Sequence, residues 1–417
     1  MKISSSVIRN SFWFILSKLN SLISGVVFFI LLARFYPKEV IGEFTYSLTI
    51  IAVFSIFVGF GLNTSIVKYF SRGEVSSSAL IKFVIVVQTI LALVSVCIIY
   101  FSYSNGFILT VLSFSLLFKS SEIFKTYFDS KLNSKAYFKL ELVLYSLMIL
   151  LKVLLAFLMI DILYIALVLV LESFFILLLL YFVYRKDGKV SGYKLPDWET
   201  YKELILDSLP VLLTGSIFIL LTKIDQIMVY NMLGVTDQAE YALASKLSEG
   251  WYFIPLGIVT SYYAVLAKNV NNELYYEYFS DACVKVNLVT IPVALFVSFF
   301  SVYIVSLIYG GEYINAASVL VVNIWNGVII GLSSITFRHF ILMNLRRYSL
   351  IRAMIGLILN VLLNYILIPL YGILGAAIAT LTSQFIALFL SNLLWEKTRI
   401  IFIIQVKSLF LLKFVSK

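Results

Sequence analysis

The side chains in this sequence that could do chemistry are charged residues set within long apolar stretches. One lies near the N-terminus and four lie between residues 223 and 249. A charge surrounded by hydrocarbon is costly, so such residues usually face a cavity or a partner of opposite charge. The candidates for a substrate-binding cleft are Lys18, Lys223, Asp225, Lys246 and Glu249.

The four later charges flank one predicted helix hairpin. Asp225 precedes its loop by about six residues and Lys246 follows the loop by about six, so at a rise of about 1.5 Å per residue they lie at similar depth and can meet. Lys246 and Glu249 are i,i+3 neighbours on one helix face. Lys223 is half a turn from Asp225 and need not face the same way. We expect the four to form a polar network, with Pro255 able to kink the second helix.

The chemistry that the lysines favour is electrostatic. Lys18, Lys223 and Lys246 could replace water around an anionic pyrophosphate that crosses a layer of low dielectric constant. For any single charge, the alternatives are a side chain that reaches the membrane interface or a buried ion pair. We expect the ion pair for Lys152 and Glu172, which flank a short predicted hairpin.

The sequence lacks the patterns of common enzymatic sites. No Walker-type glycine loop with its Lys and Ser or Thr occurs, so ATP hydrolysis by this chain is not expected. The lone histidine, His339, follows Arg338 at a predicted cytoplasmic helix end, and we expect it to be solvated at the interface. We predict no metal site, no cofactor and no enzymatic activity.

The composition determines the solvent around these residues. Of the 417 residues, 61% are hydrophobic and 13% are charged, more apolar surface than a soluble core could hide. The apolar runs are continuous and about 20 residues long, which favours membrane-spanning helices over barrel strands. We therefore predict an all-α polytopic membrane protein of about twelve transmembrane helices. The predicted spans are 12–33, 44–66, 80–103, 107–127, 139–160, 162–184, 207–230, 240–266, 284–308, 314–338, 348–369 and 372–395.

Basic residues fall mainly on one side of these crossings. Loops on the side of the N-terminus carry most of them, whereas the opposite loops carry only Arg34 and Lys38. Cytoplasmic loops retain Lys and Arg, so both termini are expected in the cytoplasm of a bacterial inner-membrane protein. The same asymmetry explains the formal net charge of +10 without a nucleic-acid partner.

A polar stretch divides the spans into two sets of six. Residues 185–206 contain glycine and proline breakers, which predicts a cytoplasmic linker between six-helix bundles at 1–184 and 207–395. Residues 30–47 align without gaps to 227–244, which indicates a weak repeat, although two unrelated hairpins could share this composition. Bundles with even span numbers would be related by an axis along the membrane normal, with a cleft between them.

Two smaller features predict local packing. Gly327 and Gly331 form a GxxxG pattern, and Gly372 and Gly375 begin the last span, so helices should pack closely at both places. Residues 396–417 are apolar but short and contain an internal lysine, which favours an amphipathic cytoplasmic tail over a thirteenth crossing.

Two stretches of this sequence resemble a known family. Residues 223–253, KIDQIMVYNMLGVTDQAEYALASKLSEGWYF, and residues 33–44, ARFYPKEVIGEF, are similar to the polysaccharide flippases of the O-antigen and capsule class. These flippases form part of the superfamily of multidrug, oligosaccharidyl-lipid and polysaccharide exporters. Tyr263 departs from the pattern, which has a proline there, and puts the bend of the eighth span in doubt.

The resemblance implies a function as well as a fold. Two six-helix bundles would alternate between inward-open and outward-open shapes and move an undecaprenyl pyrophosphate-linked oligosaccharide from the cytoplasmic to the periplasmic leaflet. Partners would be this substrate, membrane lipids, a polysaccharide polymerase and chain-length proteins, with a proton or sodium ion as a coupling ion. The sugar unit cannot be read, because hydrogen-bonding residues such as Asn63, Gln88, Asn326 and Asn360 have ordinary packing explanations.

Three other functions compete with this interpretation. A multidrug exporter of the same superfamily should favour acidic residues within the spans, whereas basic ones at least equal them here. A membrane glycosyltransferase or polymerase should carry a large external loop or a paired-acid sugar-nucleotide motif. A non-transporting scaffold would not need charges within its spans.

Overall fold

A computed structural model describes Trp13, Leu16, Asn20 and residues 24–412, except 74, 104–105, 132, 188–193 and 271. Within this part of the chain the regular structure is helical, apart from one isolated bridge between Val75 and Lys194. The predicted all-α membrane architecture is confirmed. Lys18 lies outside the described residues.

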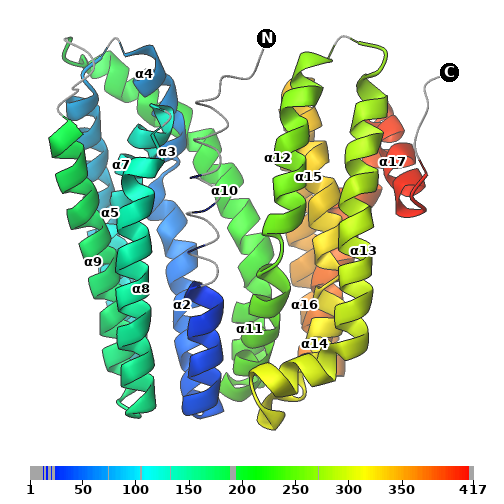
Figure 1. Cartoon of the computed structure of the whole chain (residues 1–417), viewed down its shortest axis with the longest axis horizontal. Helices are drawn as coiled ribbons and strands as arrows, with labels where there is room; N and C mark the ends of the chain where they lie inside the picture. The colour runs from blue at the N-terminus through cyan, green and yellow to red at the C-terminus, as the bar shows by residue number, and fades with distance from the viewer. Residues whose placement is uncertain are drawn as a thin grey trace. The chain divides into compact units, whose positions relative to one another are not determined.

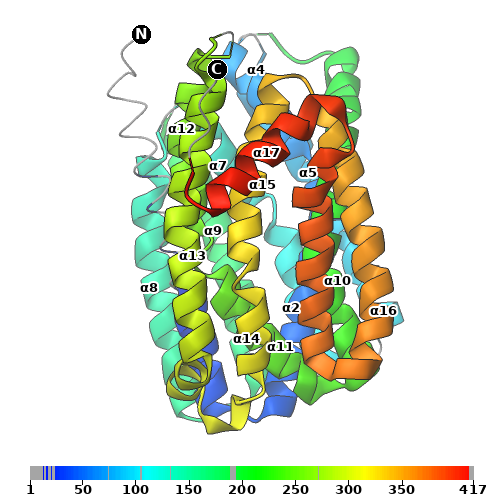
Figure 2. The ribbon, with the colours of Figure 1, turned by 90° about the vertical axis from the view of Figure 1, so that its right-hand side faces the viewer.

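The described residues contain ten helices long and apolar enough to span a membrane. Their bounds are Lys38–Gly59, Ser77–Ser102, Phe107–Ser130, Lys135–Phe157, Ile162–Asp187, Trp198–Leu233, Val235–Lys268, Tyr275–Ile308, Ala316–Leu342 and Arg347–Leu393. The last combines two predicted spans, which meet at Gly372 (φ +59°, ψ −141°) and lie side by side in Figure 2. The first predicted span is described only in part, as the apolar helix Ser24–Phe35.

Contacts divide the chain into two compact units, Met1–Ile219 and Leu220–Lys417. The first unit contains long helices that run alongside one another, among them α8 and α9 (Figure 1). Its elements are α2 (Lys38–Gly59), α3 (Leu62–Ser65), α4 (Val67–Arg72), α5 (Ser77–Ser102), α6 (Phe107–Ser113), η1 (Phe114–Phe118), α7 (Ser121–Ser130), α8 (Lys135–Phe157), α9 (Ile162–Asp187) and the first part of α10 (Trp198–Leu233).

A break after α2 brings α10 close to the first unit's core. Phe60 and Gly61 both adopt left-handed backbone conformations, with φ of +49° and +71°. A Cβ atom on Gly61 would lie 2.7 Å from the backbone oxygen of Ser208 on α10. Only glycine combines this backbone conformation with so close an approach, so the sequence must have glycine at the contact.

The start of α10 is fixed to the first unit by polar contacts. Lys68 forms an ion pair with Asp207, and this hydrogen bond raises the pKa of Lys68. The Tyr69 hydroxyl donates to a Glu203 carboxylate oxygen at 3.0 Å. The division by contacts therefore lies within α10, beyond the predicted linker at 185–206.

The second unit comprises the rest of α10 and the elements that follow it. They are α11 (Val235–Glu249), α12 (Phe253–Lys268), α13 (Tyr275–Ile308), η2 (Gly311–Tyr313), α14 (Ala316–Asn323), α15 (Asn326–Leu342), α16 (Arg346–Gln384), η3 (Phe385–Phe389), η4 (Leu390–Leu393) and α17 (Glu396–Leu409). Its core includes Leu266, Phe279, Val286, Leu332 and Ile404, contributed by four helices. Two of its spans break in the middle, at residues 250–252 and 324–325.

The C-terminal helix α17 lies against α13 and near α15 (Figure 2). Its Gln405 is buried, donates to the Thr336 hydroxyl at 2.9 Å and accepts from the Asn392 amide at 2.9 Å. The Asn287 amide donates to the Ser408 hydroxyl at 2.9 Å. The helix is thus joined to its unit by buried polar contacts as well as by apolar packing.

Candidate functional site

Three of the predicted charges come together in the second unit. Lys223 on α10 forms an ion pair with Glu249, the last residue of α11, and its Nζ lies 3.1 and 3.5 Å from the two carboxylate oxygens. Lys246 lies three residues before Glu249 and interacts electrostatically with both Glu249 and Lys223. The side chains of Lys223 and Glu249 are 13% and 36% exposed, so the pair is more open on the side of the acid.

Asp225 occupies a different, fully enclosed environment. It is 4% exposed, and its Oδ2 accepts from the Tyr241 hydroxyl at 2.6 Å and the Thr380 hydroxyl at 3.0 Å. Its Oδ1 accepts from the backbone amide of Gln226 at 2.7 Å. The structure thus places Asp225 with Tyr241 and Thr380, whereas the sequence predicted that it would meet Lys246.

The hydrogen-bond network continues from Asp225 into α16. The Asn360 amide donates to the Thr380 hydroxyl at 3.1 Å and to the Ser383 hydroxyl at 3.2 Å. The Asn364 amide donates to the Asn360 side-chain oxygen at 2.9 Å, while the Asn364 side-chain oxygen is buried without a hydrogen-bond partner. The result is an oxygen-rich cluster around one buried carboxylate.

The sequence alone does not single out most of this cluster. Tyr241 enters only within the stretch that resembles the flippase family, and Asn360 has ordinary packing explanations. A signal was present, because Asn360 and Asn364 are i,i+4 neighbours and Thr380 and Ser383 are i,i+3 neighbours, each pair on one face of an apolar helix. Polar pairs at this spacing within a span indicate a buried hydrogen-bond network.

The break in the eighth span lies beside the Lys223–Glu249 pair. Helix α11 ends at Glu249 and α12 begins at Phe253, so the chain unwinds at residues 250–252, before Pro255, where the sequence predicts a kink. The Trp251 ring packs on Gly327, where a Cβ atom would lie 2.2 Å from its Cζ2. The predicted close packing at Gly327 is confirmed, and it fixes one side of the break.

The first unit contains the other Lys–Glu pair that the sequence predicts. Lys152 on α8 and Glu172 on α9 form an ion pair, with side chains 8% and 13% exposed, and the predicted pairing is confirmed. The Lys152 ammonium also lies 5.1 Å from the ring centre of Phe28. Both side chains of this pair have little exposed surface, which fits a structural role.

The prediction for His339 is wrong. Its side chain is 1% exposed, its Nδ1 lies 2.9 Å from the Tyr275 hydroxyl, and rings of Phe279 and Phe340 contact it. The imidazole is amphipathic, so a single hydroxyl partner lets it pack among aromatic rings. Its neighbour Arg338 instead stacks over the ring of Tyr263, 4.9 Å from the ring centre.

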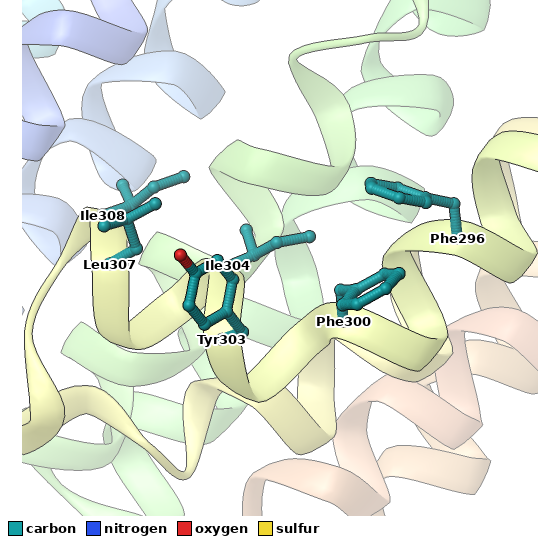
Figure 3. Close-up of a pocket in the computed structure, with 6 residues that line it drawn as sticks. All are labelled: Phe296, Phe300, Tyr303, Ile304, Leu307 and Ile308. Atoms are coloured by element: carbon teal, nitrogen blue, oxygen red, sulfur yellow. The ribbon is translucent and has the colours of Figure 1, made fainter.

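A shallow groove on α13 offers a contrast with these polar sites (Figure 3). The six residues that line it are Phe296, Phe300, Tyr303, Ile304, Leu307 and Ile308. The groove carries no charge, and its aromatic rings lie on a membrane-spanning helix. Such an apolar surface on a span is suited to contact with lipid tails.

Solved structures with the same fold are membrane transporters. The chain resembles lipid II flippase MurJ in an inward closed conformation, with a TM-score of 0.71, 18% identity and coverage of 97% of this chain and 91% of that one. It also resembles a multidrug resistance MATE family transporter of the MOP superfamily in an outward-facing conformation, with a TM-score of 0.69, 15% identity and 95% coverage of both chains. A MOP superfamily transporter from Pyrococcus furiosus matches with a TM-score of 0.64, 14% identity and 95% coverage of both chains.

The fold of this chain is therefore the one seen in multi-pass transporters of the MOP superfamily. Residues 7–267 match the family of polysaccharide biosynthesis proteins, and the chain belongs to that family. The predicted superfamily is confirmed. No curated protein matches the sequence significantly.

Proposed function

We propose that this protein is a flippase that moves an undecaprenyl pyrophosphate-linked oligosaccharide, an O-antigen or capsule repeat unit, from the cytoplasmic to the periplasmic leaflet by alternating access. The observation that carries the proposal is the pair of lysines, Lys223 and Lys246, placed together around one acid in the membrane-spanning part of a polysaccharide biosynthesis protein. Lys18 would supply a further cation.

The charges of the pyrophosphate lose favourable hydration in a layer of low dielectric constant, and fixed cations compensate for that loss. Lys223 and Lys246 are compact point charges on flexible stems, which suits phosphate groups that must be bound and then released. To cross the membrane, the sugars need only hydrogen-bond partners and a water-filled path.

We propose in addition that the Asp225 cluster holds the coupling cation, a proton or a sodium ion. A buried carboxylate with two hydroxyl groups against it can take up a proton or coordinate a hard cation. The buried Asn364 side-chain oxygen without a hydrogen-bond partner would be an additional ligand. Binding of the cation would remove the uncompensated charge of the carboxylate.

A deletion strain tests the function. Cells that lack the protein should lose long-chain surface glycan and accumulate lipid-linked repeat units inside. The wild-type chain should restore the glycan, whereas a variant with Lys223→Gln and Lys246→Gln should insert in the membrane without restoring it. Unchanged glycan with raised dye sensitivity would instead favour a multidrug exporter, and loss of repeat-unit synthesis a glycosyltransferase or polymerase.

A further inference from the structure

We propose that Glu249 is an exchangeable counter-ion of the substrate's phosphate. Glu249 pairs with Lys223 when no anion is bound, and the phosphate displaces it when the substrate arrives. This inference rests on the proposed function, because it requires that an anionic substrate binds to Lys223.

A comparison of two of the Lys–Glu pairs within the spans shows why Glu249 can leave. In the Lys152–Glu172 pair the acid is 13% exposed and the lysine also contacts the Phe28 ring. In the Lys223–Glu249 pair the lysine is 13% exposed, against 8% for Lys152, but the acid is 36% exposed. A carboxylate that water can reach is rehydrated when it separates from its partner, whereas an enclosed one is left as an uncompensated buried charge.

The charges at the site also match the exchange. Lys223, Lys246 and Glu249 carry two positive charges and one negative charge, and the acid interacts with both lysines. A phosphate group with more than one negative charge would attract both lysines more strongly than one carboxylate does. Displacement of Glu249 therefore leaves two cations facing one polyanion.

The position of Glu249 links this exchange to the shape of the helix. Glu249 is the last residue of α11, and the chain unwinds immediately after it, at residues 250–252. Within the break, Trp251 is held against Gly327. The ion pair joins the end of α11 to α10, so its release would free that end beside the break, while the Tyr241–Asp225 hydrogen bond still joins the two helices. Substrate binding would thereby change the angle at the break.

Binding of a soluble probe tests the exchange. The full-length protein in nanodiscs is titrated with farnesyl pyrophosphate, and the dissociation constant is measured for the wild type, Glu249→Gln, Lys223→Gln and the double variant. We expect Glu249→Gln to bind about tenfold more tightly, because it removes a competitor for Lys223, a difference equivalent to about 1.4 kcal/mol. Lys223→Gln should bind more weakly, and in its background Glu249→Gln should have no further effect.

A matched control removes the same charge elsewhere. Glu199 forms an exposed i,i+3 pair with Lys202, at 3.4 Å, and Glu199→Gln should leave the affinity unchanged. Turnover in proteoliposomes adds a second readout, in which Glu249→Gln should lower KM and kcat together because the bound substrate leaves more slowly. A purely structural acid would not increase affinity when replaced.

The outcomes separate the two proposals. If Lys223→Gln weakens binding but Glu249→Gln binds with equal or lower affinity than the wild type, the exchange is overturned and the flippase function stands. If the wild type does not bind the probe, or if Lys223→Gln binds it as the wild type does, the phosphate-binding role of Lys223 fails and the exchange fails with it.

Discussion

Replacing Gly327 with alanine should disturb the break in the eighth span. A Cβ atom there would lie 2.2 Å from Cζ2 of Trp251 and 2.9 Å from two further ring atoms. Carbon atoms pack at about 3.5–4.0 Å, so the indole would have to move by more than 1 Å. Overpacking of this kind costs about 1–3 kcal/mol, against a gain in helix propensity of about 1 kcal/mol for replacing glycine by alanine.

Gly257 is the matched control for this substitution. It also lies in a helix of the second unit, but a Cβ atom there meets nothing within 4 Å. Gly257→Ala should keep or raise the apparent melting temperature of the purified protein, whereas Gly327→Ala should lower it by a few degrees, at about 2–4 °C per kcal/mol. Surface glycan in the deletion strain should be restored by Gly257→Ala and reduced with Gly327→Ala.

A second substitution checks that the indole is the cause. In the double variant Trp251→Phe with Gly327→Ala, the smaller ring leaves room for the new methyl group, so part of the lost stability should return. Equal melting temperatures and equal glycan levels for Gly327→Ala and Gly257→Ala would refute the packing argument.

Three further outcomes follow from the structure. Asp225→Asn should abolish the stimulation of transport by a sodium or proton gradient in proteoliposomes while the protein stays folded, and a retained gradient response would remove Asp225 from coupling. Glu172→Gln should destabilise the first unit by about 3–5 kcal/mol in a denaturation assay, because it leaves Lys152 unpaired. The double variant Lys152→Met with Glu172→Leu should have near-neutral stability in the same assay and should retain transport. Gly61→Ala should destabilise the first unit, since its φ of +71° and the Ser208 oxygen at 2.7 Å both oppose a side chain, and an unchanged melting temperature would contradict this.

The features that could be predicted from sequence are those set locally along the chain. Apolar run lengths locate the spans, because each must cross the same hydrocarbon thickness. The Lys152–Glu172 pair was predictable because two neighbouring helices joined by a short turn place both residues at similar depth. For the same reason Lys223, Lys246 and Glu249, on two consecutive helices, could be grouped before the structure was known.

The features that escaped prediction depend on which distant helices pack together. Thr380 reaches Asp225 across 155 residues of sequence, and Tyr275 reaches His339 across 64. Hydropathy predicts that these helices cross the membrane, but it does not predict which helix faces pack against each other. The polar contacts of α17 could not be predicted for the same reason, because the partners of Gln405 lie on two other segments of the unit.

Translocation of a defined substrate tests the central claim most directly. Proteoliposomes are prepared with a polyprenyl pyrophosphate-linked oligosaccharide in the inner leaflet, and exposure of the sugar outside is followed with an added glycosidase. The wild type should expose the sugar rapidly, the variant with Lys223→Gln and Lys246→Gln should expose it at least tenfold more slowly, and an uncharged glycolipid with the same sugar should move poorly in both. Equal rates for the wild type and the lysine variant, or equal transport of the uncharged glycolipid, would contradict recognition of the pyrophosphate by these lysines.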